Sequence, residues 1–242
     1  MADTANPAFA GAIVVLPIAA LGYAQTVGTV QQHTFVHVMA GVLWTGIDLF
    51  MGLVIGPVIG GMDEESAAAF FSRFTPKAAF LLPTMAMVAI FGGITLAIRV
   101  GLLPSPDAWL ALFTFVNVPG ALLLMGRQFN AWQDRRWQLA FGISSVGAGA
   151  WVAMTIGRLA MPSATILAAL GIVTVLNLQG FGVILPGEIR VYRELQSATP
   201  DTALIQRIGA RNAKLAGIQG LFQFMIIIVM VYLRYDGLPV VG

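Results

Sequence analysis

The sequence contains no cysteine. This absence excludes disulfide bonds, thiolate metal sites, iron–sulfur clusters and covalently attached c-type haem, all of which need a cysteine sulfur. Histidine is almost as scarce, with only His33 and His37 in the chain. Any metal must therefore be bound by one of these imidazoles, by methionine, by a carboxylate or by backbone oxygen.

Charged residues are also rare. They make up 10% of the 242 residues, whereas 58% are hydrophobic, and an ordinary soluble domain has about 25% charged residues. A helix needs about 20 apolar residues to cross a hydrocarbon layer of about 30 Å, so a chain of this length has room for six to eight spans and no separate soluble domain. We therefore predict an all-α polytopic transmembrane helical bundle in which residues 1–242 form a single integral membrane domain.

Seven apolar runs give the predicted spans. The first contains Pro17 and is preceded by no Lys or Arg, which a secretory signal peptide requires, so we expect it to be retained; if it does not cross, six spans remain. The runs are Ala8–Ala24, His33–Ile59, Ala78–Ile98, Trp109–Met125, Leu139–Ile156, Ile166–Leu185 and Leu215–Leu233.

The basic residues between these runs predict an orientation. Alternate loops hold ten of the thirteen Lys and Arg residues, and cytoplasmic loops retain an excess of basic residues. The pattern predicts a cytoplasmic N-terminus and an outside C-terminus in the cell inner membrane. The ten are Arg73, Lys77, Arg127, Arg135, Arg136, Arg190, Arg193, Arg207, Arg211 and Lys214. With a formal net charge of only +2, the expected partner is the lipid bilayer and not a nucleic acid.

An internal repeat is also indicated, relating residues 56–104 to residues 185–239. Each stretch begins at a proline that ends one span and continues through a basic segment into a methionine-containing span. Both stretches end in a similar sequence that runs from an Arg to a Pro. In this alignment Asp48 falls opposite Asn177. Duplication of this kind builds some membrane folds.

The two histidines define the candidate site. His33 and His37 lie four residues apart near the outer end of the second run, and residues spaced by three and four share one helix face. The same face continues through Gly41, Trp44 and Asp48. Charged groups within a span usually face the bundle interior or a water-filled cavity. We therefore expect this stripe to face inward and Asp48 to be a proton or charge partner.

Several uses of the stripe remain open. His33 and His37 form a candidate site for copper or zinc, to which Met39 or a carboxylate would add a ligand. Alternatively, His37 binds haem b beside Trp44. Because the chain has no third histidine, a bis-histidine haem within one copy is excluded. In a third interpretation Asp48 lies on a proton or ion pathway, and in a fourth the polar groups only satisfy one another in the bundle.

No nucleophile–base constellation, paired-carboxylate motif or Gly-rich phosphate loop is visible, so a catalytic residue is unknown. A non-chemical alternative is an accessory subunit of a larger respiratory, photosynthetic or oxygenase complex. The apolar surface would then be covered by other membrane subunits or by further copies of the same chain.

The stretch from His37 to Gly46, with the proline exit at Pro57, resembles the H-x-x-A-x-x-x-W-x-G opening of the copper resistance protein D-like membrane superfamily. This group distantly includes the HemJ-type membrane protoporphyrinogen oxidase. The likeness continues through 73–104, Trp109-Leu110 and Arg211-Asn212, about half of the chain.

The resemblance implies that His37 is a haem or metal ligand on an inner helix face. HemJ-type enzymes also carry a His and a Lys after the tryptophan–leucine pair, where this chain has Ala111, Leu112 and Phe113. The resemblance therefore predicts a haem- or copper-associated redox or metal-handling protein without the partner lysine of porphyrinogen oxidation.

Overall fold

The computed structural model describes residues 1–235, and every regular element within them is a helix. Seven helical segments are long and apolar enough to cross a membrane. This finding confirms the all-α class and identifies a multi-pass integral membrane protein. The elements are α1 (Ala2–Ala5), α2 (Pro7–Thr26), α3 (Val30–Phe50), η1 (Met51–Ile55), α4 (Gly56–Gly60), α5 (Glu64–Arg99), α6 (Pro106–Gln128), η2 (Ala131–Gln133), α7 (Arg135–Thr155), η3 (Ile156–Arg158), α8 (Ala164–Gln179), η4 (Gly180–Ile184), α9 (Leu185–Leu195) and α10 (Thr202–Tyr235).

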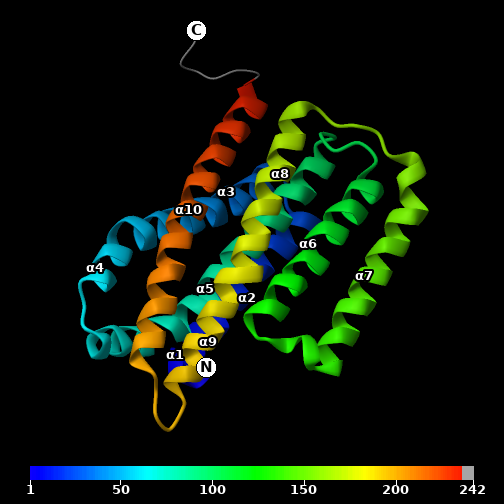
Figure 1. The fold of residues 1–242 in the computed structure, drawn as a ribbon. Helices are drawn as coiled ribbons and strands as arrows, with labels where there is room; N and C mark the ends of the chain where they lie inside the picture. The colour runs from blue at the N-terminus through cyan, green and yellow to red at the C-terminus, as the bar shows by residue number, and fades with distance from the viewer. Residues whose placement is uncertain (236–242) are drawn as a thin grey trace. The chain divides into compact units, whose positions relative to one another are not determined.

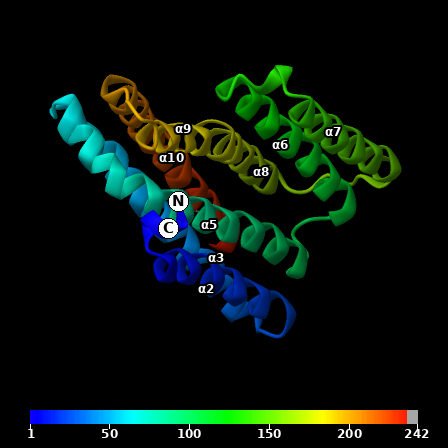
Figure 2. The same ribbon diagram turned by 90° about the horizontal axis from the view of Figure 1, so that it is seen from below.

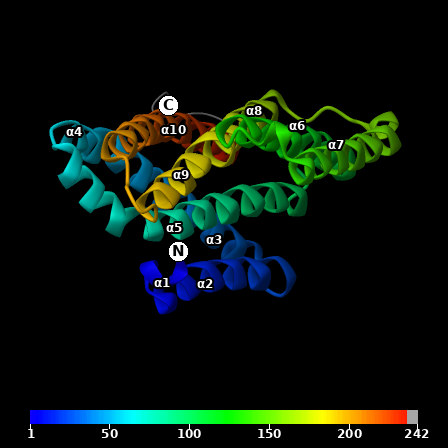
Figure 3. The same ribbon diagram turned by 60° about the horizontal axis from the view of Figure 1, so that its bottom comes forward.

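The chain divides into two compact units. The first comprises Met1–Leu96 and Ile184–Leu221, and the second comprises Ala97–Val183 and the segment that begins at Phe222. In the first unit α2 lies beside α3 (Figure 2), and α1 lies against the start of α2 (Figure 3). In the second unit α6 packs against both α7 and α8 (Figure 1). The single integral membrane domain over residues 1–242 stays a prediction.

Polar caps fix where most of the spanning helices begin. A side-chain oxygen just before each of six helices accepts a backbone N–H that the first turn leaves without a helical partner. Before α5, for example, Asp63 accepts the N–H of Ser66 at 2.8 Å. This bond and a second from the Ser66 hydroxyl hold the pKa of Asp63 below its usual value. The six caps are Asn6, Thr29, Asp63, Asp134, Ser163 and Asp201.

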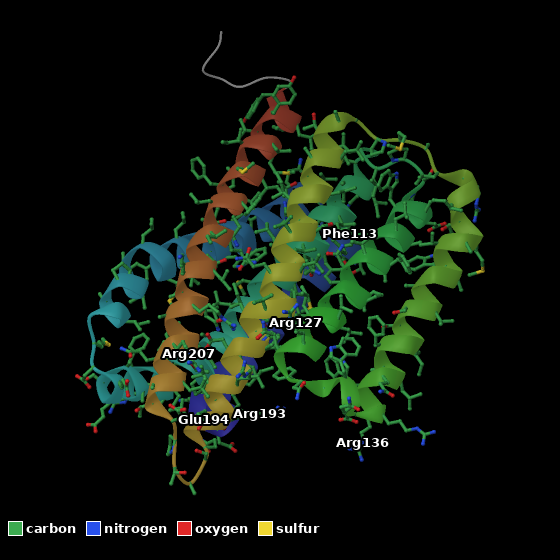
Figure 4. The ribbon with its side chains drawn as sticks, in the orientation of Figure 1. Phe113, Arg127, Arg136, Arg193, Glu194 and Arg207 are labelled. Atoms are coloured by element: carbon green, nitrogen blue, oxygen red, sulfur yellow. The ribbon has the colours of Figure 1, made fainter. Side chains whose placement is uncertain are left out.

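The helices α5 and α10 extend far beyond their predicted spans. α5 has 36 residues and α10 has 34, so at 1.5 Å per residue each is about 50 Å long, well beyond a hydrocarbon core of about 30 Å. Arg73, Lys77, Arg211 and Lys214 therefore lie within helices. The prediction that the ten basic residues occupy loops is wrong, because each of them lies within α5, α6, α7, α9 or α10. Figure 4 likewise places Arg207 on α10 itself.

In the second unit three basic residues, Arg127, Arg135 and Arg136, lie where α6 ends and α7 begins. Arg127 lies in the last turn of α6 and Arg136 in the first turn of α7, while Phe113 lies further toward the start of α6 (Figure 4). Trp137 and Phe129 meet edge to face with ring centroids 6.4 Å apart. Arginine and aromatic side chains together at a helix end are typical of the membrane–water interface.

Two π-helices interrupt the spans, each directly before a proline-containing turn. η1 is followed by Gly56-Pro57, and η4 is followed by Leu185-Pro186. A proline lacks the N–H for a helical bond, and its ring clashes with the carbonyl four residues earlier, so a wider turn before it relieves the conflict. The number of residues between Met51 and Gly180, where the two π-helices begin, equals the number between Pro57 and Pro186.

This shared interval agrees with the alignment behind the predicted repeat of residues 56–104 and 185–239. The repeat stays a prediction, and its last part, from Asp236 to Pro239, lies outside the described residues.

Glycines allow close backbone contact in the first unit. A β-carbon on Gly52 would collide with the Cα of Gly217, and one on Gly209 would collide with the ring of Phe71. η1 and α10 therefore meet backbone to backbone, as small residues permit in membranes. Phe71 belongs to a buried apolar cluster with Ile59, Val191, Ile205 and Ile208.

Candidate functional site

The predicted stripe on α3 faces the interior of the first unit. His33, Trp44 and Asp48 are 1%, 5% and 2% exposed, and His37 is half-buried. On the other side of the helix Phe35 is 65% exposed. The inward orientation of the stripe is thus confirmed, while the ligand and proton roles of its residues stay predictions.

His33 is held by a hydroxyl from α5. Its Nε2 lies 3.2 Å from Oγ1 of Thr95, which donates its own hydrogen to the carbonyl of Phe91 at 2.6 Å. Gln25 Nε2 donates to the same hydroxyl oxygen at 2.8 Å. Since the only hydroxyl hydrogen is used by Phe91, Nε2 of His33 must be the donor to Thr95.

His37 packs on the backbone of α5. Its Nδ1 lies 2.9 Å from the carbonyl oxygen of Ala89, and because a carbonyl only accepts, Nδ1 carries the hydrogen. A β-carbon on Gly93 would lie 2.8 Å from Cε1 of His37, and one on Gly92 would lie 3.3 Å from its Cβ. The two glycines therefore leave the space that the imidazole fills.

This arrangement leaves one ring nitrogen for a ligand. Nε2 of His37 makes no hydrogen bond with any described residue, and with the hydrogen on Nδ1 it presents a lone pair. Metal-ligating histidines commonly donate their other N–H to a carbonyl or carboxylate. The imidazole of His37 is therefore arranged as a single nitrogen ligand would be.

The other predicted donors are less well placed. His33 uses Nε2 in its bond to Thr95, and Met39 is 41% exposed, whereas the histidine face is turned inward. Within residues 1–235 no three or more His, Asp and Glu side chains gather as a metal site would require. The described residues therefore offer the one imidazole nitrogen of His37 and no converging set of several donors.

A second polar cluster was missed by the sequence reasoning. Glu188 on α9 is 7% exposed, and its two carboxylate oxygens accept from Thr75 on α5 and Asn212 on α10, each at 2.9 Å. All three residues belong to the first unit. The one signal in the sequence was an acid three residues beyond the apolar run that ends at Leu185.

A variant of Thr95 tests the hydrogen bond between Thr95 and the imidazole of His33. Thr95→Val removes the oxygen that accepts from His33 and Gln25, so we expect a loss of stability of about 1 to 3 kcal/mol, the cost of leaving a buried donor unsatisfied. The measurement is the free energy of unfolding in mixed micelles. Thr84→Val is the matched control, because Thr84 is also buried on α5 but bonds only the Phe80 carbonyl of its own helix. Equal losses in both variants would contradict the His33–Thr95 bond.

No family model, curated protein or solved structure matches this chain.

Proposed function

We propose that this integral membrane protein holds a b-type haem through Nε2 of His37 and has a redox role in the membrane. The observation that supports the proposal is the 2.9 Å contact between Nδ1 of His37 and the Ala89 carbonyl. It fixes the tautomer and orientation of the ring and leaves the opposite nitrogen with a lone pair, as at known metal ligands. A haem in this place would supply one-electron chemistry.

The neighbouring residues have proposed parts as well. Trp44 and Asp48 lie on the same inward face, where the indole would pack against the macrocycle and the carboxyl would act as a proton or charge partner. A buried carboxyl within a span commonly marks such a role. Membership of the copper resistance D-like group belongs to the same proposal, since it rests on the motif from His37 to Gly46.

Copper is the rival ligand. A copper ion bound by His37 would need further donors. His33 could supply one only by giving up its bond to Thr95, and Met39 only if its exposed side chain turned toward the histidine face. We further propose that the protein lies in the cell inner membrane with its N-terminus in the cytoplasm. That proposal rests on the distribution of basic residues along the chain.

The test is the visible absorption spectrum and metal content of the detergent-purified protein, expressed with haem available. We expect a Soret band that His37→Ala abolishes and that His33→Gln and Met39→Leu leave in place. The His33 and Met39 variants are the matched controls, because the proposal gives neither residue a bond to haem.

Two results would overturn the haem proposal. The first is a protein without a Soret band, and the second is a band that survives His37→Ala. Copper bound in stoichiometric amount and lost in both histidine variants would establish the rival. A protein that binds neither and co-purifies with other membrane subunits would be an accessory subunit.

A further inference from the structure

The buried carboxyl of Glu188 is a group that the proposed haem site does not use. Its Oε2 accepts the hydroxyl hydrogen of Thr75 and its Oε1 accepts an amide hydrogen of Asn212, both at 2.9 Å. The side chain comes from α9 and its partners come from α5 and α10. Three helices of the first unit thus meet at one carboxyl group.

No described residue supplies a positive charge to this carboxyl. Both of its hydrogen-bond donors are neutral, and it forms no ion pair within residues 1–235. Of the basic side chains nearest along the three helices, Arg73, Lys77 and Lys214 are exposed and Arg190 and Arg211 are half-buried. Arg211 donates to Oδ1 of Asn212 and not to the carboxyl. An ionised carboxylate buried without a counter-charge is costly, and binding a proton removes that cost.

The hydroxyl of Thr75 bonds differently from that of most helical threonines among residues 1–235. Seven other helical threonines donate to the carbonyl oxygen four residues earlier in their own helix: Thr26, Thr34, Thr45, Thr84, Thr95, Thr155 and Thr174. Thr75 instead donates across to another helix. Its own helix therefore offers an alternative acceptor, the carbonyl oxygen of Phe71, which becomes the target when the hydroxyl rotates.

We propose that Glu188 is a reversible proton-binding site whose state is coupled to the direction of the Thr75 hydroxyl. In the ionised state the Thr75 O–H donates to Oε2, as observed. When a proton adds to Oε2, the new carboxyl O–H donates to Oγ1 of Thr75, and the Thr75 hydrogen turns to the Phe71 carbonyl. One proton is bound and every hydrogen keeps an acceptor.

The orientation of Asn212 favours a proton over a metal cation. Its Nδ2 donates both to Glu188 and to the carbonyl of Ile184, at 3.1 Å, while its Oδ1 accepts from Arg211 at 3.4 Å. These bonds aim the amide nitrogen at the carboxyl, where a sodium ion would require the amide oxygen. Gly187 keeps this orientation possible, because a β-carbon there would lie 2.5 Å from Nδ2.

Infrared difference spectroscopy of the purified full-length protein tests the proposal. Spectra are recorded across the pH range in which the protein stays folded, and the carboxylic acid C=O stretch is followed. We expect a C=O band that titrates in the wild type and is absent from Glu188→Gln. Glu65→Gln is the matched control, because Glu65 is an exposed acid of the first turn of α5, and the band should persist in it.

The coupling to Thr75 has its own readout. Thr75→Val removes the acceptor of the carboxyl O–H in the protonated state and should shift the C=O band to higher frequency, whereas Thr84→Val should leave it unchanged. The comparison of Thr75→Val with Thr84→Val still tests the proposal if Glu188→Gln does not fold. The proposal is overturned if no band distinguishes wild type from Glu188→Gln, if Thr75→Val leaves the band unshifted, or if the band responds to sodium at constant pH. The last result would identify a cation site instead.

Discussion

Gly52→Val is expected to destabilise this protein by about 3 kcal/mol or more, at the upper end of the cost of overpacking. A β-carbon at position 52 would collide with the Cα of Gly217, which is backbone and cannot rotate away. The two helices would have to separate, and the neighbouring contact of Gly220 with Leu49 would be lost with them. Since proteins are stable by only about 5 to 15 kcal/mol, little folded protein should accumulate.

The measurement is the yield of monodisperse protein in detergent together with its free energy of unfolding. Gly46→Ala is the matched control on the same helix, because an added β-carbon there meets nothing within 4 Å. It should be neutral or stabilising by about 0.5 to 1 kcal/mol, the usual difference between alanine and glycine in a helix. A Gly52→Val protein as stable as the control would show that η1 and α10 do not pack at this point.

The spans themselves could be predicted because apolar length is set by the bilayer. Their ends could not. The predicted run Ala78–Ile98 lies within the longer helix Glu64–Arg99. At its N-terminal side the helix continues through polar residues to the cap at Asp63. Hydropathy reports where a helix is apolar, whereas the caps and the tertiary packing decide where it stops.

The histidine stripe could be predicted because all of its members lie on one helix and follow its period. Its partners could not, because Ala89 offers only a backbone carbonyl and Thr95 looks like any other helical threonine. The cluster of Glu188, Thr75 and Asn212 was even harder to predict from the sequence. Its three side chains lie far apart in the sequence, and single polar residues at the ends of apolar runs are common in membrane proteins.

The bond between Asn212 and Glu188 leads to the second large expected effect. Asn212→Ala removes the donor to Oε1 of Glu188 and to the Ile184 carbonyl and leaves a gap beside Gly187. A hydrogen bond to a charged group contributes about 1.5 to 3 kcal/mol. With the second bond lost as well, we expect a decrease of about 2 to 4 kcal/mol in the free energy of unfolding. Gln206→Ala is the control on the same helix, because its amide bonds the Met62 and Ile59 carbonyls and no buried acid, and it should lose about 1 kcal/mol.

A double variant separates the cluster from simple loss of packing. Replacing both members of a buried polar pair with apolar side chains of similar size is often close to neutral, so Glu188→Met with Asn212→Leu should recover most of the stability that Asn212→Ala loses. Thr75 would then have no partner across the helices, and its hydroxyl would turn to the Phe71 carbonyl without further cost. If instead the double variant is less stable than Asn212→Ala, the carboxyl and the amide stabilise the bundle by contacts other than the bond between them.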